Sequence, residues 1–391
     1  MIRAILKQVF FALLTLWAIA TGTFFLMEFA PGGPASAERR LHPVVEAANL
    51  ASLGLADLVR SACAGRIRSL PPEGQSVAAT EQAGRVEGDP GCAIQPGHDG
   101  EVFSLLVQPG DQVAAGQALF TVRPSAWVRY LRMLASIATL DLGVTYTSRG
   151  DRTVREVLAQ GLPVSATLGL LALGIALVIG WPAGLVAAAR PGSFADRALS
   201  VLATAQVSIP SLVLAPLLLY VFSIRFSVFS AGGLEGPSDL VLPAATLGLI
   251  LAGLIQRMTR AGAASFLASP TAMVLRARGL SEVRLLGVHA LRHAAIPMLG
   301  YLPPVVAGLL TGSLVVERVF NLPGISRHLV AAALNRDHPV VLGVVLAYSV
   351  LLVGLNMLAS VLHPVLDPRV RDRDLRDRGP DVRPMLEGPT A

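Results

Sequence analysis

The stretch that decides the fold reads Arg276-Ala277-Arg278-Gly279-Leu280-Ser281 and continues, eight residues later, as His289-Ala290-Leu291-Arg292-His293-Ala294-Ala295-Ile296-Pro297. Residues 270–278 predict a short helix that ends before Gly279, and Ser281 favours the start of a second helix. Long apolar runs lie on both sides of this basic segment. The pattern therefore predicts a compact knob outside a membrane, of a kind that can seat in a groove of another protein.

The composition agrees with a membrane location for the flanking runs. The 391 residues are 53% hydrophobic and only 15% charged, whereas soluble domains carry about 25% charged residues. These values exclude an ordinary soluble domain and a disordered chain, and two cysteines are too few for a small disulfide scaffold. The chain is predicted to be a polytopic, all-α membrane protein.

Six apolar runs predict six transmembrane helices. The first lies within residues 1–35 and favours a retained helix over a signal peptide, because it is long and lacks a convincing cleavage site. The distribution of arginine places both termini in the cytoplasm, since basic residues gather in the stretches that would face it. A cytoplasmic tail is expected over 372–391. The other five helices are predicted at 162–189, 198–223, 240–256, 298–316 and 340–363.

Lysine is almost absent, which restricts the chemistry of the chain. Only Lys7 is lysine among the 32 basic residues, so no phosphate-binding loop of the Gly-Lys-Ser/Thr kind exists. Any ATP hydrolysis must occur on another polypeptide. The net charge of +6 follows the membrane topology, and no aromatic-rich basic motif predicts a nucleic-acid partner.

The basic segment resembles the cytoplasmic coupling loop of ABC-importer permeases of the dipeptide, oligopeptide and nickel type. Within 257–297, residue and spacing match at Gly279, His289, Arg292 and Pro297, while Arg278 and His293 replace the usual lysine and asparagine. The resemblance implies that this loop binds an ATPase subunit. The implied interface residues are Arg276, Ala277, Arg278, Gly279, Leu280, Ser281, His289 and Arg292.

Further ordered matches extend the resemblance over residues 1–35 and about 125–371, including Asp141-Leu142-Gly143 and Glu317-x-Val319-Phe320. The resemblance implies a type I importer permease in a bacterial inner membrane, with a core over 126–371. It also implies a second, non-identical permease subunit, two ATPase subunits that hold ATP and Mg, and an extracytoplasmic solute-binding protein. The solute, whether peptide, nickel chelate or another compound, is not identified by these motifs.

Residues 36–125 depart from the family and predict a small, mostly β extracytoplasmic insert. A helix is expected over 43–62, and Gly100, Gly110 and Gly116 are expected at turns between short strands. Residues 94–119 resemble half of a biotinyl/lipoyl-type hammerhead, predicted over 65–122, and an irregular Gly-rich loop is the alternative fold. Because efflux adaptors also contain this module, an export component that docks an envelope partner is the alternative function. No lysine is present to carry a cofactor. Cys63 and Cys92 are either disulfide-bonded or two unpaired thiols.

No catalytic, cofactor-binding or metal-binding constellation is recognisable in the sequence. The chain is therefore predicted not to be an enzyme and to bind no cofactor of its own, with membrane lipid as a further partner. Polar or helix-breaking residues inside predicted spans are the candidates for a translocation path. These are Gln206, Pro210 and Asn356, and the two polar side chains could instead bond between helices.

Overall fold

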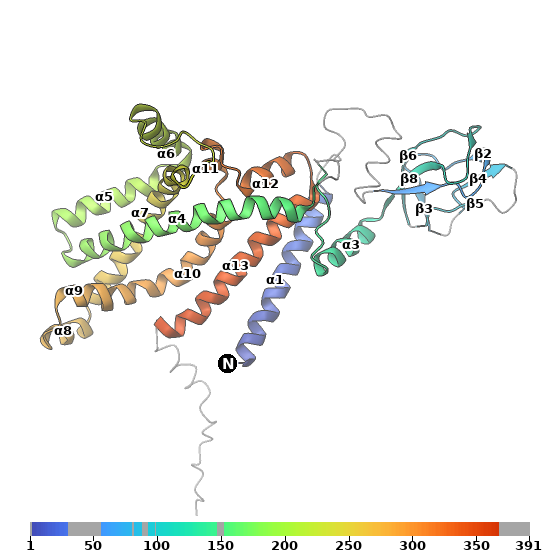
Figure 1. Cartoon of the computed structure of the whole chain (residues 1–391). Helices are drawn as coiled ribbons and strands as arrows, with labels where there is room; N and C mark the ends of the chain where they lie inside the picture. Colours follow the sequence, from blue (N-terminus) through green and yellow to red (C-terminus); the bar gives the residue numbers. More distant parts are fainter. Residues whose placement is uncertain are drawn as a thin grey trace, which may run out of the picture. The chain divides into compact units, whose positions relative to one another are not determined.

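The computed structural model describes residues 2–29, 56–79, 82–87, 93–97, 99–146 and 152–366. The chain forms two compact units (Figure 1). The first consists of Met1–Gln8, Leu162–Ser326 and Tyr348–Ala391, and the second of Val9–Gly161 and Arg327–Ala347. The predicted tail over 372–391 lies outside the described residues.

Among the described residues, five helical segments are long and apolar enough to cross a membrane, and a bent pair of helices brings the number to six. The fold is therefore the mostly helical, multi-span one predicted from the sequence. The main helices are α1 (Ile2–Glu28), α4 (Val154–Ala189), α5 (Phe194–Ser208), α6 (Ser211–Leu218), α7 (Val241–Leu267), α10 (Leu291–Leu310) and α13 (His338–Leu366). Shorter ones are η1 (Leu219–Arg225), η2 (Pro237–Leu240), α11 (Leu314–Val319) and α12 (Ile325–Leu334).

The third predicted span, 198–223, is broken into α5 and α6, which meet at an angle of 101°. Ile209 has an extended backbone (φ −81°, ψ 117°) and Pro210 precedes the first residue of α6. A residue before proline is sterically kept out of the α conformation. The sequence Ile209-Pro210 is thus the physical cause of the break.

Two other predicted spans have different ends in the structure. The fourth, expected to stop at residue 256, continues as α7 to Leu267, because helix formation does not require apolar side chains once the chain leaves the hydrocarbon. The fifth, expected over 298–316, starts earlier and ends at Leu310. Gly312 follows in the left-handed region (φ +98°) and separates α10 from α11.

Small residues let α4 and α7 approach closely in the first unit. A Cβ atom at Gly180 would lie 2.8 Å from the carbonyl oxygen of Ala252, and one at Gly184 would lie 2.5 Å from the Cβ of Thr259. Gly174 on the same helix is exposed and has no such neighbour within 4 Å. In α4, Gly180 and Gly184 are therefore packed against α7, whereas Gly174 is not packed against a neighbour.

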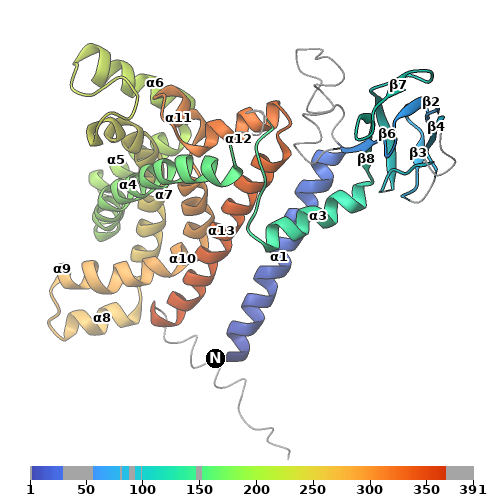
Figure 2. The same cartoon turned by 45° about the vertical axis from the view of Figure 1, so that its right-hand side comes forward.

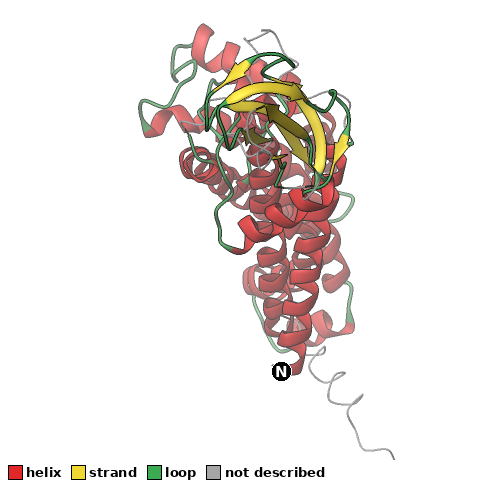
Figure 3. Cartoon of the chain, turned by 90° about the vertical axis from the view of Figure 1, so that its right-hand side faces the viewer, coloured by secondary structure: helices red, strands yellow, loops and turns green. Residues whose placement is uncertain are grey.

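The second unit contains a β-sandwich. Its strands are β1 (Asp57–Arg60), β2 (Gly65–Ser69), β3 (Ser76–Val77), β4 (Gly84–Glu87), β5 (Ala93–Ile94), β6 (Gly100–Leu105), β7 (Gln112–Val113) and β8 (Ala118–Pro124). They form two antiparallel sheets of order β1-β8-β6-β3 and β5-β4-β2-β7, drawn in yellow in Figure 3. Both sheets contribute to one apolar core, to which Phe120 and Ile67 belong.

The prediction of a helix over 43–62 is wrong at its end. Asp57–Arg60 is strand β1, paired with β8, and residues 43–55 lie outside the described residues. The helix prediction rested on a weak apolar periodicity. The structure instead has a strand, in which buried Val59 alternates with exposed Arg60. The β fold therefore begins at Asp57 and ends at Pro124, beyond both limits of the predicted 65–122 segment.

The turn glycines of the insert are partly as predicted. Gly110 (φ +101°) and Gly116 (φ +84°) adopt the left-handed conformation. Gly100 instead starts β6, where a Cβ would lie 2.3 Å from the carbonyl oxygen of Arg123, so it permits close strand pairing rather than a turn. Cys63 is disulfide-bonded. Cys92 lies outside the described residues, and the pairing of these two cysteines stays a prediction.

Helix α3 (Ala126–Ala138) follows β8 and packs across α1 in the second unit (Figure 2). Ser125 caps its start, because its hydroxyl oxygen accepts a hydrogen bond from the amide of Val128. Tyr130 and Met133 are buried against Ala20, Phe24 and Phe25 of α1. The β-sandwich is thus joined without a linker to a helix that rests on the first span.

The difference in packing between Gly180 and Gly174 leads to a testable prediction. Gly180→Val should lower the melting temperature of the purified protein, since overpacking costs about 1–3 kcal/mol. Gly174→Val provides the matched control, because its side chain would enter open space. Thermal unfolding in detergent, followed by circular dichroism, measures both. Equal melting temperatures for the two variants would contradict the packing described here.

Candidate functional site: the basic knob

The knob between α7 and α10 begins with a well-capped short helix. Ser269 caps α8 (Pro270–Ala277) by accepting a hydrogen bond from the amide of Ala272 at 3.4 Å, and proline occupies the first helical position. The helix lies where the sequence predicted it. In Figures 1 and 2, α8 lies at the opposite end of the first unit from α6 and α11.

Gly279 ends α8 in a Schellman motif. Its φ is +81°, its amide donates to the carbonyl of Arg276 at 2.9 Å, and the amide of Leu280 donates to the carbonyl of Leu275 at 3.2 Å. The left-handed conformation strains any residue with a Cβ, which explains the glycine in the Arg-Gly-Leu-Ser sequence. The motif turns the chain sharply toward the next helix.

An ion pair closes the turn. Arg276 donates from Nε to Glu282 Oε1 at 2.7 Å and from Nη2 to Oε2 at 3.3 Å, and these hydrogen bonds raise the pKa of Arg276 above its usual value. Ser281 precedes α9 (Glu282–Arg284), as predicted, but its side chain makes no cap hydrogen bond. Glu282 therefore ties the start of α9 to the end of α8.

The base of the knob is packed onto α7. A π-helical turn, η3 (Leu285–Ala290), leads into α10, and Leu285 and Ala290 are fully buried. The His289 ring stacks on Phe266 with centroids 6.5 Å apart. A Cβ at Gly262 would lie 2.6 Å from the Cα of Ala294. Of the predicted interface residues, His289 thus faces the knob's own base, and the structure gives it a packing role.

The outer surface of the knob carries an apolar patch that the sequence analysis missed. Its members are exposed apolar side chains of α8, α9 and η3, and Val283 is exposed to 82%. Predicted interface residues Ala277, Arg278 and Ser281 are exposed around it, and Arg292 is exposed at the start of α10. The apolar residues Met273 and Val274 on a helix predicted outside the membrane could have signalled the patch. The patch consists of Met273, Val274, Val283 and Val288.

A partly buried ion pair joins α5 to α7. Arg260 of α7 donates from Nε and Nη2 to the two carboxylate oxygens of Asp196, at 2.5 and 2.8 Å. Asp196 is 3% exposed and also accepts a hydrogen bond from the amide of Gly192 at 2.9 Å. The pair joins the α4–α5 turn to α7. Sequence reasoning missed it, although Asp196 is the one acid in the predicted cytoplasmic turn between the second and third spans.

The three path candidates are not brought together into one site. Gln206 lies against α7, where a Cβ at Gly253 would be 2.9 Å from the Gln206 Cβ. Its Oε1 is buried and has no hydrogen-bond partner among the described residues. Pro210 is exposed at the bend, and Asn356 is exposed and donates to the carbonyl of Leu352 within α13. Of these three candidates, Gln206 is the one whose side-chain oxygen is buried without a hydrogen-bond partner among the described residues.

A second buried polar cluster surrounds Glu317. Its carboxylate accepts hydrogen bonds from Ser165 Oγ at 2.6 Å and from the amide of Ser326 at 3.0 Å. A Cβ at Gly324 would lie 2.3 Å from the carboxylate carbon, so the glycine makes room for it. The sequence analysis singled out Glu317 within a motif without revealing this contact. The cluster fixes α11 and the start of α12 to α4.

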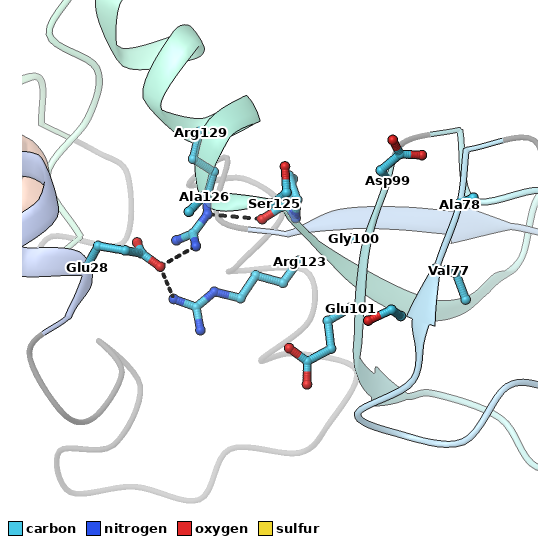
Figure 4. A pocket seen from close by; sticks show the side chains of 12 residues that line it. Glu28, Val77, Ala78, Asp99, Gly100, Glu101, Arg123, Ser125, Ala126 and Arg129 are labelled. Atoms are coloured by element: carbon cyan, nitrogen blue, oxygen red, sulfur yellow. Dashed lines mark hydrogen bonds and ion pairs between the residues drawn. The ribbon is translucent and has the colours of Figure 1, made fainter.

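The second unit has an open pocket of about 590 Å³ beside the β-sandwich (Figure 4). Glu28 accepts a hydrogen bond from Arg129 at 2.5 Å and pairs with Arg123 at 3.5 Å. Asp99 and Glu101 line the same pocket.

Among the described residues, no group of three or more His, Cys, Asp or Glu is placed to hold a metal ion.

Known proteins resemble the chain over most of its length. Residues 180–372 match the family of binding-protein-dependent transport system inner membrane components. The dipeptide transport system permease protein DppB of Bacillus subtilis (strain 168) is 36% identical over 243 residues, which are 62% of this chain and 79% of that protein. The oligopeptide transport system permease protein OppB of Salmonella typhimurium is 31% identical over 373 residues, 95% of this chain and 100% of that protein.

A solved amino acid ABC transporter is similar over 54% of this chain and 94% of that chain, at 17% identity and a TM-score of 0.40. The sequence relatives, the family match and the set of spanning helices support one assignment. The chain belongs to the binding-protein-dependent inner-membrane components, and it is the multi-pass permease subunit of an ABC importer whose ATP hydrolysis lies on separate subunits.

Proposed function

We propose that this permease imports peptides delivered by an extracytoplasmic binding protein. Support for a peptide solute comes from the dipeptide and oligopeptide permeases to which the chain is similar. The path is formed with a second, non-identical permease subunit, and both termini and the knob face the cytoplasm. The positive-inside bias of the arginines supports this orientation.

The knob is the site at which an ATPase subunit binds. The observation that carries this proposal is the knob's construction: a turn closed by an ion pair, with a packed base and an exposed apolar patch. An apolar helix face with basic residues around it suits a groove in a partner protein. Motion of the ATPase would then pass through α8 to α7 and α10, and shift the bundle between two packings.

Val283→Asp should weaken binding of the ATPase subunit at least about five-fold, since losing one interface anchor costs about 1 kcal/mol or more. Ala195→Asp is the matched control, because it adds the same charge at an exposed first-turn position of α5, where an acid is tolerated. Co-purification of the ATPase with each variant measures the effect. Equal recovery with both variants would count against the knob as the binding surface.

A transport assay in liposomes tests both the direction of transport and the identity of the solute. In liposomes that contain both permease subunits and both ATPases and are loaded with ATP, a labelled peptide added outside should accumulate inside. Accumulation should require the purified binding protein, and liposomes without that protein are the control. Import without any response to the binding protein, or no peptide import at all, would overturn the proposal.

The alternative is an export component that uses the β-sandwich to dock an envelope partner. The two four-stranded antiparallel sheets around one core favour it, because they agree with the hammerhead resemblance of the insert. ATP-driven movement of solute in the outward direction in the same liposomes would establish export. The family match to binding-protein-dependent systems favours import.

We further propose that Gln206, Pro210 and Asn356 line the translocation path, and that the Gln206 side chain makes a polar contact with the peptide. Gln206→Leu should change the KM for peptide uptake without lowering the melting temperature, because its oxygen has no partner among the described residues to lose. Gln256→Leu is the comparison. The Gln256 amide donates to the carbonyl of Leu199 at 2.6 Å, so its loss should cost about 1 kcal/mol of stability. An unchanged KM in Gln206→Leu would exclude Gln206 from the path.

A further inference from the structure

Helix α3 carries an exposed apolar stripe. Trp127 is 66% exposed and Leu131 is 60% exposed. The two residues are four apart and so lie on one face of the helix. The neighbouring face carries Tyr130 and Met133, which are buried against α1. The helix is therefore apolar on two sides, and only one of them is covered by the described parts of its own unit.

Contacts with α1 fix how deep α3 lies in the membrane. The Thr21 hydroxyl is hydrogen-bonded to the Tyr130 hydroxyl at 2.9 Å, and the Trp127 ring meets Phe25 edge-on with centroids 6.2 Å apart. Glu28, the last residue of the span, binds Arg129. Thr21 precedes Glu28 by seven residues, about 10 Å of helix at 1.5 Å per residue. The contacts thus cover the last ~10 Å of the span, the depth to which interfacial helices sink.

The polar groups of α3 fit the same placement. Arg129 binds Glu28, and Arg132 pairs with Asp57 of β1 at 3.1 Å with its side chain 41% exposed. Both arginines lie away from the Trp127 stripe on the helix. At the level where a span ends, basic side chains meet lipid headgroups while tryptophan favours the boundary of the acyl chains. Near the end of α1, Leu26 is also exposed, at 76%.

From this we infer that α3 is an interfacial helix of the outer leaflet: Trp127 and Leu131 insert among lipid acyl chains and the arginines lie at headgroup level. Lipid is the occupant because α3 shares its depth and its exposed apolar surface with the end of a membrane-spanning helix. Because β8 ends at Pro124, directly before the α3 cap, the helix also anchors the β-sandwich to the membrane surface. The inference requires membrane insertion of the chain and does not depend on the transported solute.

Depth-dependent fluorescence quenching tests the inference in the full-length chain, reconstituted with its partner subunits. The chain has three tryptophans, so Trp17→Phe with Trp181→Phe leaves Trp127 as the only one on this chain. The reconstitution uses partner subunits whose tryptophans are replaced by phenylalanine. Lipids brominated near the headgroup should reduce Trp127 fluorescence more than lipids brominated near the chain ends.

Trp17 provides the internal depth control. It is eleven residues before Glu28, about 16 Å along α1, so a chain that retains only Trp17 should show the reverse order of quenching. If the Trp127 chain fails to assemble, Leu131→Trp in a background without other tryptophans reports the same face. Quenching of Trp127 by iodide in the buffer, without quenching by brominated lipid, would show a water-facing helix and overturn the inference. Quenching by neither would show that another protein subunit covers α3, and would overturn it as well.

Discussion

Close packing against α7 is the constraint on which the first unit depends. Lipid tails are as apolar as leucine, so helices in a bilayer associate through van der Waals contact rather than through expulsion of water. The glycines supply that contact: Gly180 and Gly184 of α4 meet α7, and Gly262 of α7 meets Ala294 of α10. Helices held this closely move together. The break at Ile209-Pro210, where no continuous helical hydrogen bonding is possible, is by contrast a place where the bundle can deform.

Charged side chains complement the glycines by fixing the ends of helices. Asp196 and Arg260 join the α4–α5 turn to α7, Glu317 joins α11 to α4, and Glu28 joins the end of α1 to α3. A buried carboxylate deprived of its donors is strongly destabilising, because desolvation is then uncompensated. These contacts specify which ends stay together. A transport cycle that keeps them must place its movements elsewhere, in the helix break and at subunit contacts.

The sequence predicted those features that depend on local patterns. Apolar length located the spans, and Pro270 and Gly279 located α8, because the residues that start and end a helix are its immediate neighbours in the sequence. The extent of α7 was missed, since Arg257 and Arg260 end the apolar run but not the helix. The helix predicted through residue 62 was wrong because β1 is specified by pairing with β8, about sixty residues away in the chain. The Asp196–Arg260 and Glu317–Ser165 contacts depend on tertiary proximity, which spacing alone does not reveal.

The length of α7 has a mechanical consequence. Its 27 residues form a rod about 40 Å long, whereas the hydrocarbon of a bilayer is about 30 Å thick. The rod therefore projects beyond the lipid and reaches Ser269 and the knob without an intervening flexible loop. A tilt of about 5° at one end of such a rod displaces the other end by about 3.5 Å, roughly the width of a water molecule. A small rotation of the knob would thus be amplified with distance, and the length of α7 suits it to act as a lever arm.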